Sequence, residues 1–85
     1  MYFVYILHSQ QLSKYYVGIT DDVNGRLKKH LTNHKGFTGK AKDWKVLYTE
    51  SYSTKYEARK RELQIKGWKS KRMIEKIIFD HDSSS

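Results

Sequence analysis

Five side chains of the kinds that handle phosphate groups are spread along this chain. They are Tyr5, Tyr16, Arg26, His30 and Glu62. An arginine can hold a phosphate through two parallel hydrogen bonds, a histidine can move a proton, and a carboxylate can bind a divalent cation. A phenol has a pKa near ~10, so it acts as a base only where a nearby cation or metal-bound water lowers that value. Together these residue types suit phosphodiester hydrolysis assisted by one metal ion.

The two tyrosines are expected to share one face of a β-hairpin. Residues 2–7 and 14–20 are rich in aromatic and β-branched side chains, which favours strands. If residues 9–12 form the turn, Tyr5 lies directly opposite Tyr16, whereas a slip of one residue would separate them. The alternative is that both are ordinary half-buried strand residues, which is the interpretation given to the remaining tyrosines.

Gly18 interrupts the second predicted strand. A glycine inside a strand indicates a bulge or a close approach by another group.

Arg26 and His30 lie four residues apart, so they project from the same face of a predicted helix. Asp21 or Asp22 can cap the start of this helix. The helix carries a separate apolar stripe at Val23, Leu27 and Leu31. Arg26 and His30 are therefore left to line a site, and the alternative is an exposed pair on a basic helix.

The second half of the chain predicts one strand and two helices. Residues 44–51 alternate as a strand does. Thr54 and Glu57 have the spacing of a capping box, and Gly67 is expected to end the helix that they begin. Ser70 can cap a last helix with an apolar stripe. The stripe consists of Met73, Ile74, Ile77 and Ile78.

Glu62 is one of three acids between residues 55 and 76, against nine lysines and arginines. It shares a helix side with a small and an apolar residue, so it should face inward. A buried carboxylate needs a partner. A divalent cation is one candidate, and an ion pair with Arg59 or Lys66 is the other.

The composition predicts one domain, residues 1–80, followed by a disordered tail at 81–85. The net charge of +8 favours a polyanionic partner, or solubility through repulsion. The absence of cysteine excludes disulfides and zinc-thiolate sites. No apolar run is long enough to cross a membrane and no signal peptide is recognisable, so we expect a cytoplasmic protein. The lysines expected to meet nucleic acid, several of them in a basic loop at 35–43, are Lys28, Lys29, Lys35, Lys40, Lys42 and Lys66.

These residues resemble the GIY-YIG nuclease domain over about residues 2–79. The first motif would be Phe3-Val4-Tyr5, and the second would be Tyr16-Val17-Gly18, followed by Arg26-Leu27 and His30. Residues 57–68 are similar to the helix that carries the metal-binding glutamate of the family. The chain looks most like small stand-alone bacterial members related to the nuclease domain of a DNA excision-repair enzyme. Phe3 stands where the motif begins with glycine, and Ile19 stands where some members carry lysine.

The resemblance implies an α+β fold in which three helices flank a three-stranded antiparallel sheet, in the order β-β-α-β-α-α. It implies cleavage of DNA with Mg²⁺ (or Mn²⁺) and no small-molecule cofactor. By the same resemblance, Tyr5 or Tyr16 is the general base, Arg26 stabilises the phosphate charge, and His30 assists. Glu62 is then the metal ligand.

Three hypotheses remain open from the sequence. The first is a metal-dependent DNA endonuclease, the second a non-catalytic nucleic-acid-binding module with the nuclease fold, and the third a small interaction partner whose charge serves solubility. The first accounts for all five candidate site residues. Fold alone does not decide between them.

Overall fold

The computed structural model describes residues 1–31 and 41–83, and the side chains to residue 80. The elements follow the predicted order β-β-α-β-α-α. They are β1 (Tyr2–Ser9), β2 (Lys14–Thr20), α1 (Val23–Leu31), β3 (Lys45–Tyr52), α2 (Lys55–Trp68) and α3 (Lys71–Ser83). No helix in the described ranges is both long and apolar enough to span a bilayer.

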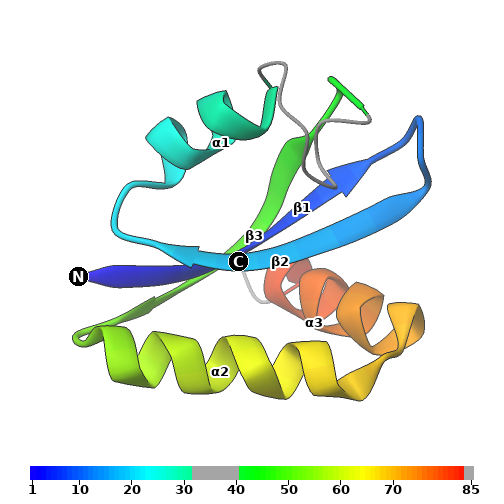
Figure 1. Ribbon diagram of the computed structural model, residues 1–85. Helices are drawn as coiled ribbons and strands as arrows, with labels where there is room; N and C mark the ends of the chain where they lie inside the picture. Colours follow the sequence, from blue (N-terminus) through cyan, green and yellow to red (C-terminus); the bar gives the residue numbers. More distant parts are fainter. Residues whose placement is uncertain (32–40, 84–85) are drawn as a thin grey trace.

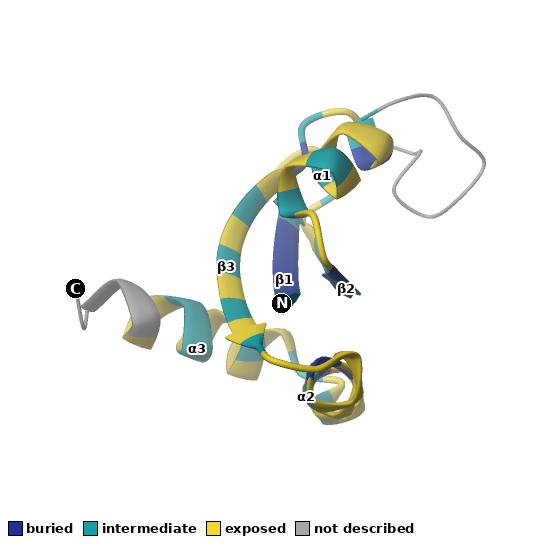
Figure 2. Cartoon of the chain, turned by 90° about the vertical axis from the view of Figure 1, so that its left-hand side faces the viewer, coloured by how far each residue is buried: buried dark blue, intermediate teal, exposed yellow. Residues whose placement is uncertain are grey.

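The strands form one antiparallel sheet in the order β2-β1-β3, with α1 over one face and with α2 and α3 over the other (Figure 1). The predicted fold class is therefore confirmed. The central position of β1 explains its unbroken apolar run, because each face of that strand meets a helix layer. Residues 4–7 of β1 are all at most 2% exposed, as the dark strand at the centre of Figure 2 shows.

The hairpin register differs from the prediction by two residues. Tyr5 pairs with Gly18, and Leu7 pairs with Tyr16. Because side chains alternate with a period of two, a shift of two keeps Tyr5 and Tyr16 on the same face. The turn moves because β1 continues to Ser9, whose hydroxyl donates to Asp43 at 2.6 Å and is fully buried.

Each face of the sheet has its own apolar cluster. Val4, Ile6 and Val17 pack with Ala58 and Ile65 of α2. On the opposite face, β1 and β2 side chains pack with residues of α1 and of the segment before β3. The buried members of this second cluster are Tyr5, Leu7, Ala41 and Trp44. Tyr5 belongs to the second cluster and Tyr16 packs against it, so both candidate tyrosines lie on the α1 face, whereas Glu62 is carried by α2 on the other side of the sheet.

The helix starts match the sequence better than the helix ends. Thr54 accepts from the backbone of Glu57 at 3.2 Å, which confirms the predicted cap of α2. The prediction that Gly67 ends this helix is wrong, because α2 runs through Trp68 and Lys69 takes the left-handed cap conformation at φ 50°.

The last helix also departs from the prediction in two ways. Met73 is 42% exposed, so the apolar stripe of α3 is narrower than predicted, while Ile74, Ile77 and Ile78 do pack on the core. The backbone of α3 extends to Ser83, three residues into the predicted tail.

Candidate functional site

Tyr5 lies across the edge strand β2, over Gly18. A Cβ atom added at Gly18 would lie 2.6 Å from the Tyr5 hydroxyl and 2.7 Å from the ring carbon that carries it. No side chain fits in that space, so the glycine is required by the close approach that the sequence indicated. The pairing of β1 with β2 runs without a bulge at this point.

The Tyr5 hydroxyl reaches His30 of α1. Tyr5 Oη and His30 Nε2 lie 2.9 Å apart, and both side chains are buried. Tyr16 completes a cluster of three rings, with its centroid 6.2 Å from that of Tyr5 and 4.8 Å from that of His30. The two tyrosines thus share one face, as predicted.

Burial raises the pKa of Tyr5, and the neighbouring Tyr16 and Glu62 raise it further, while Arg26 opposes them. Tyr5 therefore keeps its proton at neutral pH. A protonated phenol suits hydrogen bonding and proton relay better than it suits the role of base.

Helix α1 places Arg26 and His30 at different depths. Asp22 caps the helix, accepting from Gly25 N at 3.1 Å through its side chain and from Arg26 N at 3.0 Å through its carbonyl. His30 is 7% exposed beneath the helix, whereas Arg26 is exposed and lines a hollow of about 370 Å³ that also includes Arg59 of α2. The alternative of an exposed Arg26–His30 pair is therefore wrong for His30.

Glu62 faces inward from α2, as predicted, and is 5% exposed. One oxygen, Oε2, accepts from Lys66 Nζ at 3.2 Å, and the other, Oε1, is 3.6 Å from the Arg59 guanidinium. Oε1 is buried and accepts no hydrogen bond from any described residue. The ion-pair alternative is thus realised with both cations, Lys66 on Oε2 and Arg59 on Oε1, while Oε1 is left without a hydrogen-bond donor among the described residues.

The residues around Glu62 fit only a sparsely coordinated metal. The described part of the chain contains no group of three or more histidine, cysteine, aspartate or glutamate side chains that could enclose an ion. A single carboxylate with several waters suits Mg²⁺, which dehydrates reluctantly. This arrangement excludes a closed structural site of the zinc kind within those residues.

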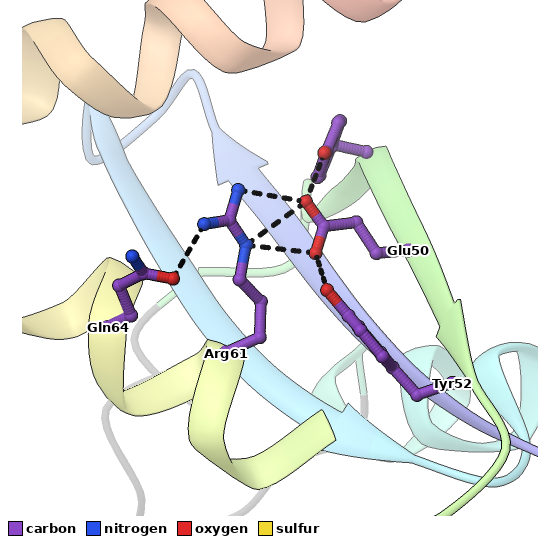
Figure 3. Close-up of polar contacts among 5 residues, drawn as sticks. Glu50, Tyr52, Arg61 and Gln64 are labelled. Carbon is purple, nitrogen blue, oxygen red and sulfur yellow. Dashed lines mark hydrogen bonds and ion pairs between the residues drawn. The ribbon is translucent and has the colours of Figure 1, made fainter. Parts of the chain in front are cut away.

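A second carboxylate with several hydrogen bonds, the half-buried Glu50 of β3, was not singled out from the sequence. Arg61 Nε donates to its two oxygens at 3.0 and 3.3 Å, and Tyr52 Oη donates at 2.6 Å (Figure 3). Tyr48 Oη also donates to Glu50, and Gln64 accepts from Arg61 at 2.8 Å. Burial alone would raise the pKa of Glu50, but the hydrogen bonds from Arg61 and the tyrosines lower it overall. The alternation of Tyr48, Glu50 and Tyr52 along one strand face was the available signal.

This network lies on the face of the sheet opposite α1. It joins β3 to α2 and leaves Glu50 surrounded by donors. Its role is therefore to hold the helix that carries Glu62.

The predicted basic residues fall into three groups. Lys28, Lys29 and Lys42 are exposed, and Lys66 is paired with Glu62. Lys35 and Lys40, with most of the predicted basic loop, lie outside the described residues.

Comparison with known proteins agrees with this fold. The GIY-YIG catalytic domain family matches residues 1–76. UPF0213 proteins from two strains of Staphylococcus epidermidis are 38% identical over 78 residues, which is 89% of this chain and 93% of each relative. The solution NMR structure of a UPF0213 protein from Bacillus halodurans superposes with a TM-score of 0.57 at 29% identity, over 92% of this chain and 83% of that one. The family match identifies a small nuclease-type domain, and the chain belongs to the GIY-YIG family. The relatives compared above are all UPF0213 proteins.

Proposed function

We propose that this protein is a metal-dependent endonuclease that hydrolyses DNA phosphodiester bonds in the cytoplasm. The observation that carries the proposal is the buried Glu62 carboxylate, whose Oε1 accepts no hydrogen bond from the described residues. A buried carboxylate is costly unless its oxygens are matched. Lys66 and Arg59 form ion pairs with Glu62, but no described residue donates a hydrogen bond to Oε1. Family membership supplies the nuclease class.

The burial of each site residue suggests its role in the reaction. Arg26 is exposed, and its fork of donors can hold the phosphate as negative charge develops on it. Tyr16 is half-buried, and we assign to it the contact with the attacking water. Tyr5 and His30 form the buried pair behind it and relay the proton.

Glu62 would hold a divalent ion, Mg²⁺ or Mn²⁺, through Oε1. When bound, such an ion supplies positive charge beside the reacting phosphate. The protein would fix its place by burying the carboxylate against Ala58 and Ile65 on the same side of α2.

The test is cleavage of plain, nicked, flapped and branched DNA with Mg²⁺ or Mn²⁺. Glu62→Gln keeps the shape of the side chain and removes its charge, so we expect at least a roughly hundredfold loss of cleavage. DNA binding in EDTA should stay equal or become slightly tighter, because one negative charge is gone. Electron paramagnetic resonance of Mn²⁺ should show weaker binding by the variant.

Glu57→Gln is the matched control, because Glu57 is an exposed acid on the same helix. It should leave cleavage and Mn²⁺ binding unchanged. A parent protein that binds DNA but cuts none of these substrates would instead be a non-catalytic binding module. Equal cleavage by Glu62→Gln and the parent would make Glu62 an ion-pair residue only.

A further inference from the structure

A second hollow of about 590 Å³ lies between β2 and the junction of α2 with α3. Its floor is apolar, because Val17 and Ile65 are buried and Ile74 is half-buried. Its rim is cationic. The four exposed lysines that line it are Lys14, Lys66, Lys69 and Lys71. We call this hollow the β2–α3 groove.

The charge of the β2–α3 groove is not neutralised from within. No carboxylate is among its lining residues. Two acids lie at its border: Glu62 holds Lys66, and Glu75 interacts with the Tyr15 hydroxyl. No described residue forms an ion pair with Lys14 or Lys69. The groove therefore presents net positive charge to an anionic partner.

Two strained backbone positions lie on opposite walls of this groove. Ser13 has φ 54° and Lys69 has φ 50°, and these are the positive φ angles among the described non-glycine residues. Glycine is the usual residue at a left-handed helix cap, yet Gly67 lies two positions earlier, inside α2. The fold would be more stable with glycine at position 69, so stability does not explain the lysine there.

Lys71 fixes the shape of the groove. Its Nζ donates to the Ser13 carbonyl at 2.9 Å and lies 5.9 Å from the Tyr15 ring centroid. These contacts tie the β1–β2 turn to the start of α3. The rim is therefore preformed, with one lysine committed to structure.

The β2–α3 groove borders the candidate active site. Tyr16 belongs to both, and Lys66 lies between the groove and Glu62. On the other side of Glu62, Arg59 lines the hollow that holds Arg26. Arg59 and Lys66 are seven residues apart on α2, a rise of roughly 10 Å, so cations continue past the reacting position on both sides.

We propose that the β2–α3 groove binds an unpaired DNA strand next to the phosphate that is cut. The strand phosphates meet the lysine rim, and a sugar or base rests on the apolar floor beside the Tyr15 ring. A duplex keeps its bases stacked inside, so it would touch only the rim. The proposal rests on the proposed nuclease function for the position of the cut, but not for the binding itself.

The test is Lys69→Gly, measured by fluorescence anisotropy in EDTA with one oligonucleotide, single-stranded and as a duplex. Glycine relieves the left-handed strain, so the variant should melt a few degrees higher. It should nevertheless bind the single strand roughly fivefold more weakly, with a salt slope smaller by about 0.7. Binding of the duplex should change less. A residue that served only the helix cap would not combine greater stability with weaker binding.

Two controls accompany this variant. Lys69→Arg keeps the charge and the strain, and it should bind as the parent does. Lys76→Gln removes an exposed lysine of α3 that does not line the groove, and it should have a smaller effect on single-strand binding.

Two results would contradict the proposal that the β2–α3 groove binds an unpaired strand. One is unchanged single-strand binding by Lys69→Gly, and the other is an equal loss of affinity for the single strand and the duplex. If Lys69→Gly selectively loses single-strand affinity but the parent protein cuts no DNA, the groove proposal is supported and the proposed nuclease function is contradicted. The two proposals therefore fail separately.

Discussion

Tyr5 and Tyr16 share a face of the sheet but differ in their access to water. Tyr5 is 2% exposed and hydrogen-bonded to His30, whereas Tyr16 is half-buried at the edge strand. Because burial raises the pKa of Tyr5, very little of it is present as the phenolate that could accept a proton. The two residues should therefore respond differently to removal of the hydroxyl.

We expect Tyr16→Phe to lower single-turnover cleavage by roughly a hundredfold or more, the scale of general acid–base catalysis. Tyr5→Phe should cost less in rate but should lower the unfolding free energy by about 1–2 kcal/mol, because it leaves the buried His30 without the Tyr5 hydroxyl. Single-turnover rates and thermal melts of both variants measure these effects. If Tyr5→Phe lost more cleavage rate than Tyr16→Phe, Tyr5 rather than Tyr16 would be the residue that contacts the attacking water.

At single residues, the sequence predicts what local periodicity determines. Glu62 faces inward because helix spacing puts it beside Ala58 and Ile65, and both are buried. The burial of His30 did not follow from spacing, since spacing gives a direction around α1 and not the distance to the sheet. The ring cluster with Tyr5 depends on that distance.

The strand β3 and helix α2 are joined by a half-buried ionic network in addition to apolar packing. Glu50 accepts from Arg61, Tyr48 and Tyr52, and Arg61 also lies 5.5 Å from the Trp68 ring centroid. Removing one partner leaves the other charge unmatched, which costs more than the pair contributes. This contact therefore sets the position of α2, and of Glu62 on it.

The pH dependence of stability should report this network. The pKa of Glu50 is lowered from 4.5, so its contribution is present above that value and is lost as pH falls through the lower folded pKa. Glu50→Gln should reduce the unfolding free energy by roughly 2–3 kcal/mol at neutral pH, and the difference should shrink below pH 4.5. Urea unfolding across this pH range measures the effect. A double-mutant cycle of Glu50→Gln with Arg61→Gln gives the coupling energy between the two side chains. A difference that stays constant with pH would contradict the assignment.

At alkaline pH the same network makes stability fall as pH rises, the opposite of its effect at acid pH. The pKa values of Tyr48 and Tyr52 are raised from 10.0 to about 12, first by burial and then by Glu50. Their neutral forms stabilise the fold below pH 10, and this contribution is lost as pH rises towards 12. The parent should therefore lose stability at both ends of the pH scale.

At the scale of elements, the order and the types were predictable because each strand and helix carries its own period. The hairpin register was not, since the burial of Ser9 depends on Asp43, 34 residues away. The end of α2 was mispredicted because a glycine near a helix end is the usual cap, whereas here the lysine after Trp68 takes that place. The hairpin register and the end of α2 therefore depend on more than the local sequence pattern.

Across the whole molecule, positive charge is in excess and part of the negative charge is already engaged. The net charge is +8, while Glu50 and Glu62 are held by cations and Asp43 accepts from Ser9 and Gln11. Exposed lysines such as Lys28 of α1 and Lys76 of α3 therefore add to a surface of net positive charge. Such a surface attracts a polyanion and repels itself.

Self-repulsion should make the protein more stable as salt is added. Raising KCl from low to physiological ionic strength shortens the Debye length to about 8 Å, which screens repulsion between exposed lysines but weakens the half-buried Glu50–Arg61 pair less. If screening contributes about 1 kcal/mol, the melting temperature should rise by roughly 4–8 °C. Lys28→Gln combined with Lys76→Gln removes two exposed charges, so +8 becomes +6 and the rise should be smaller. Differential scanning calorimetry across a KCl series measures both proteins, and a melting temperature that falls with salt would mean that attraction between surface charges outweighs their repulsion.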